Sequence, residues 1–159
     1  MSTLPQTAIE GDFQLVEFIC FTLGDQEFGI PITQVKEIIV PPPITRVVHT
    51  PALIKGVINI RGVIIAVLDI KQLFSVESIE IHPDRQRIII VSTEEKTAGF
   101  LVDSIEVLKT AKNSEISKLE SSAEATDSFS EGVIQLFSHP LTVLSVPKII
   151  NCSELKKVE

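Results

Sequence analysis

The stretch Val57-Ile58-Asn59-Ile60-Arg61-Gly62-Val63-Ile64-Ile65-Ala66-Val67-Leu68 contains two runs of apolar residues on either side of a two-residue turn. Residues 57–60 and 63–68 are rich in Val and Ile, whose branched side chains favour strands. Arg61-Gly62 supplies the glycine that a tight hairpin turn needs. This stretch therefore predicts a β-hairpin.

The same pattern occurs three more times along the chain. The predicted strand pairs are 16–23 with 27–32, 87–92 with 98–102, and 132–137 with 141–146. Short strands separated by turn residues at this spacing are typical of β-sandwiches and β-barrels. The sequence therefore predicts an all-β fold.

Helical signals are few and short. The segment 33–39 could form one or two turns capped by Thr33, and it must end before the prolines at 41–43. Residues 51–55 could form one turn with Pro51 at its start and Gly56 at its end. The segments 70–74 and 149–155 are similar candidates. Residues 113–131, rich in Ser, Glu, Ala and Thr, predict an exposed loop.

The order hairpin, turn, hairpin occurs once in the first half of the chain and again in the second. We therefore expect one folded domain over residues 14–155, built from two small subdomains at 16–76 and 86–150. The polar segment 1–13 predicts a flexible N-terminal tail, and 156–159 a C-terminal tail.

Charge and composition exclude several classes of function. The formal net charge is −7 with no dense Lys/Arg run, which disfavours nucleic acid and anionic lipid as partners. No apolar run approaches the roughly 18 residues that span a bilayer, and the first residues do not resemble a signal peptide. Cytoplasmic localisation without membrane insertion is expected. The two cysteines are too few for a disulfide framework, and Cys20 lies in an apolar run typical of a core.

Catalytic and metal-binding patterns are absent from the sequence. His49, His82 and His139 lie far apart without the spacing of zinc ligands. Asp69 and Asp103 each follow an apolar run, so they could be an acid–base pair or residues that end a strand and cap a turn; the second interpretation is favoured. We therefore predict no catalytic residue, no metal and no cofactor. The residues alone indicate a small β protein that binds a partner.

A long signature adds a family resemblance to this interpretation. Its parts are Phe21-Thr22-Leu23-Gly24, Glu27-Phe28-Gly29-Ile30, Val35-Lys36-Glu37-Ile38, residues 50–62 with the sequence TPALIKGVINIRG, Val67-Leu68-Asp69-Ile70 and Phe100-Leu101-Val102-Asp103. Together they resemble the CheW family over about residues 16–150.

This resemblance implies two five-stranded β-barrels packed around a hydrophobic groove. The groove is expected to receive the helical hairpin tip of a chemoreceptor, and another surface to meet the regulatory domain of the histidine kinase CheA. The implied function is a non-enzymatic adaptor, recruited to membrane-bound receptor arrays, that modulates kinase activity. Alternatives are an interaction module in a twitching, gliding or phototaxis pathway, a small-ligand-binding barrel, or an unrecognised enzyme.

Nine residues are expected to contact the receptor or the kinase. The resemblance places Arg61 and Glu37 in the contact region, where Arg61 could pair with Glu37 or with a carboxylate of a partner. Val35 and Ile38 would share one face of a short helix. Ile88 and Ile89 lie on a strand, so at most one of them can face the groove. The signature contributes the remaining three, Gly56, Asn59 and Gly62. A solvated turn charge, a structural glycine and core packing are the competing interpretations.

Overall fold

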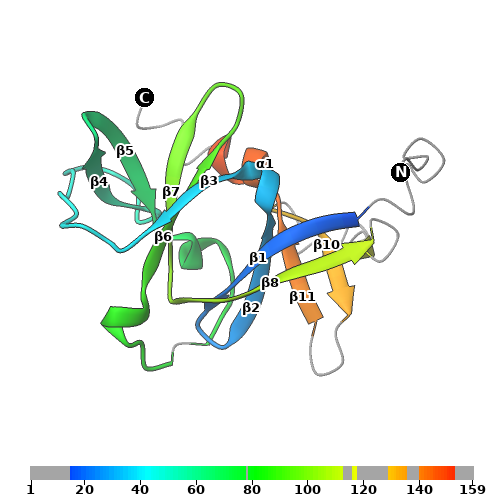
Figure 1. Ribbon diagram of the computed structural model, residues 1–159. Coiled ribbons are helices and arrows are strands. Elements are labelled where there is room, and N and C mark those ends of the chain that lie inside the picture. The colour runs from blue at the N-terminus through cyan, green and yellow to red at the C-terminus, as the bar shows by residue number, and fades with distance from the viewer. Residues whose placement is uncertain (1–14, 78, 113–115, 118–128, 136–139, 153–159) are drawn as a thin grey trace.

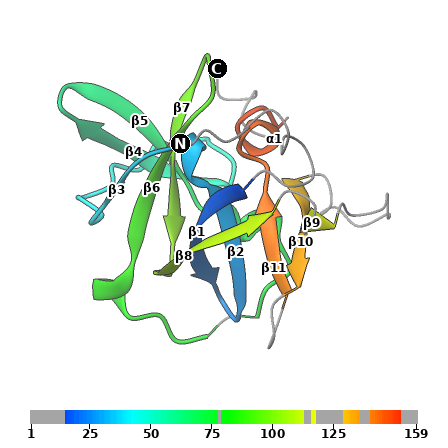
Figure 2. The same cartoon turned by 45° about the vertical axis from the view of Figure 1, so that its right-hand side comes forward.

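A computed structural model describes residues 15–77, 79–112, 116–117, 129–135 and 140–152 of the chain. These residues form two β-sheets, several single-turn 3-10 helices and one short α-helix. Figures 1 and 2 show the sheets next to each other in both views, with α1 close to one end of them. The predicted all-β class is confirmed, with helix in short pieces only.

Sheet A has the strand order β8-β1-β2-β11-β10-β9. Its strands are β1 (Leu15–Leu23), β2 (Gln26–Pro31), β8 (Ser104–Lys112), β9 (Ile116–Ser117), β10 (Ser130–Gln135) and β11 (Pro140–Leu144). Sheet B has the order β3-β6-β7-β5-β4. Its strands are β3 (Val35–Ile39), β4 (Ile54–Ile60), β5 (Val63–Leu68), β6 (Arg87–Ser92) and β7 (Thr97–Val102). The helical pieces are η3 (Ile32–Gln34), η4 (Ile70–Leu73), η5 (Pro83–Arg85) and α1 (Val146–Ile150).

The four predicted hairpins are present as antiparallel pairs. They are β1–β2, β4–β5, β6–β7 and β10–β11. In each pair the two strands are neighbours along the chain, which is why local sequence signals found them. Strand β8 was not expected, although it pairs with β1 along nearly its whole length.

The sheets divide the chain differently from the predicted subdomains 16–76 and 86–150. Sheet A takes β1 and β2 from the first half and β8 to β11 from the second, whereas sheet B takes β3 to β7 from the middle. Two parallel pairs, β2 with β11 and β5 with β7, join strands far apart in the sequence. Such long-range pairing leaves no signal in neighbouring residues, so hairpin order alone misplaced the boundary.

Two of the predicted helices are wrong in part. The segment 33–39 contains only the end of η3, and residues 35–39 form strand β3 paired with β6. The β-branched residues Val35, Ile38 and Ile39 favour this strand. Residues 51–55 form a turn closed by the Ile54 N–H on the Pro51 carbonyl, at 3.0 Å, and then enter β4.

The C-terminal part also differs from prediction. Helix α1 begins at Val146, inside the strand predicted over 141–146, and its first turn is capped by Ser145 Oγ, which accepts from the Lys148 N–H at 3.3 Å. The predicted helix over 149–155 therefore starts earlier, and its residues 153–155 lie outside the described residues. The segment 70–74 contains η4 as expected. Within the predicted loop 113–131, residues 116–117 form β9 and residues 130–131 begin β10, while the rest, like the tails 1–13 and 156–159, lies outside the described residues apart from Phe129.

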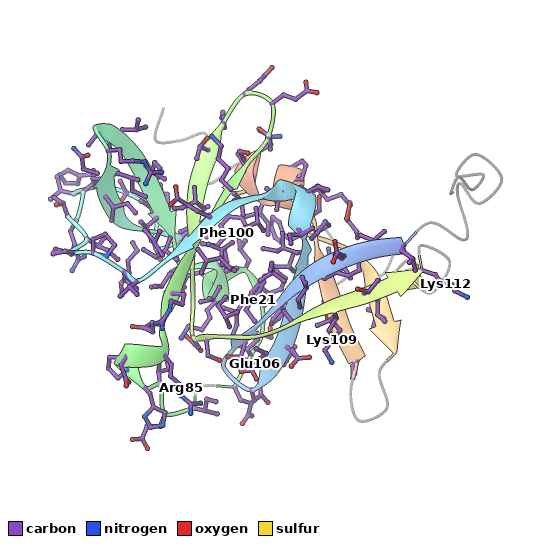
Figure 3. All side chains as sticks on the ribbon, viewed as in Figure 1. Phe21, Arg85, Phe100, Glu106, Lys109 and Lys112 are labelled. Atoms are coloured by element: carbon purple, nitrogen blue, oxygen red, sulfur yellow. The ribbon has the colours of Figure 1, made fainter. Side chains whose placement is uncertain are left out.

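Apolar side chains gather in three clusters. The largest, here called the inter-sheet core, contains buried residues of both sheets, including Phe21 of β1 and Phe100 of β7, which lie in the middle of the molecule (Figure 3). A second cluster packs on the other face of sheet A around Phe18 and Cys20. A third packs on the other face of sheet B around Ile58, Ile65, Val67, Ile88 and Ile90. Both faces of each sheet are therefore partly buried.

Candidate partner-binding surface

The turn between β4 and β5 is held in one conformation by its own residues. Arg61 and Gly62 have φ values of 50° and 87°, the positive values that a two-residue hairpin turn requires at both positions. Asn59 Oδ1 accepts a hydrogen bond from the Gly62 N–H at 2.9 Å. Three residues of the predicted site thus form one preorganised turn, with the Arg61 side chain 73 % exposed.

Arg61 reaches across to β3, the strand at the opposite end of the sheet B order. Its Nη2 atom donates to Glu37 Oε2, in both a hydrogen bond and an ion pair. Edge strands can meet in this way only because the sheet is strongly curved. A recess of about 300 Å³ is lined from β3 by Lys36 and Glu37 and from the hairpin by Ile60, Arg61 and Val63. Of the two partners expected for Arg61, Glu37 or a carboxylate of a partner, the structure shows Glu37.

Val35 and Ile38 lie on one face, though for a different reason than predicted. A register shift between Val35 and Glu37 places Val35 opposite Val91 and Ile38 opposite Ile89. Val91 and Ile89 are two apart on β6, so their side chains share a face, and their partners on β3 share it too. Val35 packs against the inter-sheet core, whereas Ile38 is 37 % exposed. Ile38 is therefore the more accessible of the two.

Gly56 has a structural role that its position explains. It lies within β4 beside a register shift, rather than at a helix end, and its φ is 156°. A Cβ atom at this position would lie 2.4 Å from the carbonyl oxygen of Thr45 and 2.6 Å from Ile44 Cγ2. The Thr45 segment approaches this closely because it makes two backbone hydrogen bonds with Val57, at 2.8 and 2.9 Å.

Ile88 and Ile89 are both fully buried and face opposite sides of β6. Ile88 packs in the sheet B cluster and Ile89 in the inter-sheet core. The prediction that neighbours on this strand point in opposite directions holds. The expectation that the pair offers a contact to a partner is corrected, because neither side chain has exposed surface.

Four exposed apolar residues, two after the hairpin turn and two in the segment that pairs with β4, lie outside the predicted site. Val63 and Ile64 directly follow the turn and are 58 % and 62 % exposed. Val47 and Val48, in the segment that pairs with β4 through Thr45, are 41 % and 77 % exposed and line a recess of about 910 Å³. A valine pair between Pro43 and Pro51, in a segment too polar for a strand, was the available signal. Where such side chains form a contiguous patch, they are typical of surfaces that bind partners.

The described titratable side chains offer no metal site, and the buried thiol among them is unreactive. Among the described residues no group of three or more His, Cys, Asp or Glu side chains is placed to hold a metal. Burial raises the pKa of the Cys20 thiol from its ordinary value of 9.0 to about 11, and the nearby Glu27 carboxylate adds to this. A thiol with such a pKa stays protonated and unreactive at neutral pH. The prediction that Cys20 is a core residue is confirmed.

The two aspartates and the histidines are also placed by the fold. Asp103 Oδ2 accepts from the Gly24 N–H at 2.7 Å, so it caps a turn, although a distant one. Asp69 precedes η4 and its Oδ2 accepts from Gln72 Nε2 at 3.3 Å. His49 and His82 are exposed, and His139 lies outside the described residues. No described helix has the length and apolarity required to cross a membrane.

Comparisons with known proteins agree with this fold. The family model described as CheW-like domain matches residues 17–154. The chain is 28 % identical over 144 residues to the chemotaxis protein CheW of Klebsiella aerogenes, covering 90 % of this chain and 86 % of that protein. It is 31 % identical over 136 residues to the chemotaxis protein CheW of Bacillus subtilis, covering 85 % and 86 %.

A solved structure shows the same architecture. The crystal structure of the scaffolding protein TtCheW from Thermoanaerobacter tengcongensis superimposes with a TM-score of 0.81 and 25 % identity, covering 89 % of this chain and 91 % of that one. The family match spans nearly all of the described sequence, and sequence and structure agree on it. This chain belongs to the CheW-like domain family.

Proposed function

We propose that this chain is a non-enzymatic adaptor that couples chemoreceptors to the histidine kinase CheA and so sets the activity of the kinase. The observation that carries the proposal is the CheW-like family match over residues 17–154, supported by the scaffolding protein of the same fold. In this function the adaptor lies in the cytoplasm at membrane-bound receptor arrays. It needs no cofactor, because its work is to hold two proteins in a fixed arrangement.

We place one partner contact on what we call the hairpin contact region. It consists of six exposed or half-buried residues on β3 and at the β4–β5 turn: Val35, Glu37, Ile38, Asn59, Arg61 and Gly62. Three properties support this choice. The turn is preorganised, so little conformational entropy is lost on binding. The Arg61 side chain is 73 % exposed, and the planar fork of its guanidinium suits a carboxylate on a partner.

The third property is the apolar surface next to the turn. Ile38 on β3 and Val63 and Ile64 on β5 combine exposed aliphatic surface with the charge of Arg61. A protein partner buries such apolar groups and orients itself by the charged ones. The helical hairpin tip of a chemoreceptor and the regulatory domain of CheA are the proposed partners of this adaptor.

Capture experiments test the proposal directly. A soluble receptor hairpin fragment and the CheA regulatory domain are immobilised separately and exposed to the purified chain. The chain should bind each fragment, and chain held on receptor fragment should then retain the kinase domain. Arg85→Ala serves as the matched control for Arg61→Ala, because Arg85 is an exposed arginine on η5, away from the hairpin contact region (Figure 3). Binding to neither fragment would rule out the adaptor function.

A further inference from the structure

The described chain passes between the two sheets at only two places. From β2 it enters sheet B through η3, and from β7 it returns to sheet A through the single residue Asp103. Figure 1 shows this second passage, where β7 ends and β8 begins. A one-residue connection makes the orientation of the sheets depend on how that residue is held.

Asp103 is fixed from both sheets. Its carboxylate is only 8 % exposed, and Oδ2 accepts from the N–H of Gly24, in the turn between β1 and β2 of sheet A. Oδ1 lies 3.2 Å from Nζ of Lys71, on η4 directly after β5 of sheet B. The Asp103 N–H donates to the Thr22 carbonyl at 3.0 Å. One buried carboxylate thus bonds to the first hairpin of sheet A and to the end of sheet B.

The polar contacts continue along the same boundary. Asp25 Oδ1 accepts from the Glu77 N–H at 3.0 Å, and Gln26 Nε2 donates to the Ser75 carbonyl at 3.2 Å. A Cβ atom on Gly24 would lie 2.3 Å from the Glu77 carbonyl oxygen, so the two segments are in close contact. We call this set of contacts, between residues 24–26, residues 71–77 and Asp103, the inter-sheet seam.

The inter-sheet core and the seam make different contributions. The core buries many large apolar side chains from both sheets, which stabilises their association far more than one ion pair does. Apolar burial is non-directional, however, and tolerates small rotations of one face on another. Hydrogen bonds and charge-assisted contacts depend on direction and distance. The core therefore holds the sheets together, and the seam supplies the directional contacts between them.

We propose that Lys71 and Asp103 are positioning residues that fix the relative orientation of the two sheets, and that coupling between the adaptor's partners depends on this orientation. The inference rests on the proposed adaptor function. An adaptor can transmit a conformational change from one protein to another only if it is rigid. Its two sheets must therefore keep their relative orientation. Neither residue belongs to the hairpin contact region, so loss of the ion pair should affect coupling rather than binding.

Two readouts test the proposal on the full-length chain. Spin labels on Glu17→Cys in β1 and Glu94→Cys in the β6–β7 turn, in a Cys152→Ser background, report the distance between the sheets. Both sites are exposed. The second readout compares binding to each partner alone with control of kinase activity in the assembled receptor–kinase complex. The variants are Lys71→Met and Asp103→Asn, with Lys71→Arg as the conservative control that keeps the cation.

The expected result is a broader distance distribution for Lys71→Met and Asp103→Asn, with unchanged affinity for each separate partner. Control of the kinase should fall by about fivefold or more. Lys71→Arg keeps the cation, so its distance distribution and its kinase control should both match those of the wild type. If Lys71→Met does not fold, Asp103→Asn tests the proposal alone. This variant removes the ion pair, while its amide oxygen can still accept from the Gly24 N–H and so keep the turn in place.

Two outcomes would overturn the inference: distributions as narrow as the wild type with full kinase control, or coupling lost only in proportion to binding. Failure of the proposed function would look different, because the wild-type chain itself would not couple the partners, while the label distances would still show whether the ion pair fixes the sheets.

Discussion

Arg61 and Glu37 form an ion pair that connects the β4–β5 turn to β3, the strand at the opposite end of the sheet B order. The pair lies at the surface, where the Arg61 side chain is 73 % and the Glu37 side chain 33 % exposed. Solvent screens such a pair strongly, so its contribution to folding is small. We therefore propose a role for this pair in recognition rather than in folding.

Replacing Arg61 by Ala should weaken capture by the receptor hairpin or by the kinase domain while the fold keeps its stability. We expect the free energy of unfolding to change by less than about 1 kcal/mol. Chemical denaturation and binding titrations on the same sample measure the two effects. Glu37→Ala and the double variant complete a cycle that isolates the pair itself. Unaltered affinity for both partners would remove Arg61 from the contact region.

Gly56 and Gly62 should respond differently to substitution by Ala. At Gly56 the new Cβ would collide with the Thr45 carbonyl, 2.4 Å away, so we expect roughly 1–3 kcal/mol from steric overlap in addition to backbone strain. A Cβ added at Gly62 would have no heavy atom within 4 Å apart from its own chain neighbours. Only the positive φ opposes a side chain there, at a cost of about 1–2 kcal/mol. Thermal and urea unfolding compare the two. Equal losses would contradict the close packing of residues 44–45 on β4.

Single changes to Ser should separate core residues from contact residues on neighbouring strands. Ile88→Ser and Ile89→Ser each place a hydroxyl in a fully buried apolar site and remove packing, at an expected cost of about 2–5 kcal/mol. Ile38→Ser should cost far less, because Ile38 is 37 % exposed, yet it should weaken partner binding. The loss of stability caused by Val35→Ser should lie between that of Ile38→Ser and that of the two buried variants. Unfolding curves recorded beside binding curves provide the check. A stable Ile89→Ser variant with lost binding would overturn this assignment.

The Cys20 thiol should make the stability of the chain fall at alkaline pH. Its pKa is about 11 in the folded chain against an ordinary 9.0. Below about pH 9 the thiol is protonated in both the folded and the unfolded state, so its burial contributes fully to the free energy of unfolding. Between these values the unfolded state releases a proton that the folded state keeps, so stability decreases as pH rises, by up to about 2–3 kcal/mol.

The difference in unfolding free energy between wild type and Cys20→Ala, followed from pH 8 to 11, isolates this effect from the titration of lysines. The chain has no tyrosine to add to the background. A difference that does not change with pH would show that burial does not raise the pKa. At neutral pH, a thiol reagent should label Cys152 long before Cys20.

Local sequence signals found the hairpins and missed the way they assemble. Gly24-Asp25 and Arg61-Gly62 each close a turn between adjacent strands, and a pattern of a few residues describes such a turn completely. The pairing of Phe28 on β2 with Thr142 on β11 joins residues more than a hundred positions apart, and no local pattern encodes it. The division of strands between the sheets follows from these distant pairs, so the order of hairpins along the chain does not reveal it.

The contact residues show the same limit. Arg61 was identified as an exposed turn residue able to pair with Glu37, since the turn signal and the charge are both visible in the sequence. The Thr33 cap and the prolines at 41–43 predict a short helix that would place Val35 and Ile38 on one face, whereas a register shift in β3 produces the same outcome on a strand. For Ile88 and Ile89, alternation predicts opposite faces but cannot show that sheet B is covered on both sides.

The proposed function of this chain is to join a receptor to a kinase. The most direct measurement is the activity of CheA in the presence of receptor hairpin assemblies, with and without the purified chain. Kinase activity and co-sedimentation of kinase with receptor should rise together as the chain is added and saturate at a fixed ratio, and Arg61→Ala should need a higher concentration to reach the same level. Kinase that neither sediments with receptor nor changes its activity when the chain is added would contradict the claim.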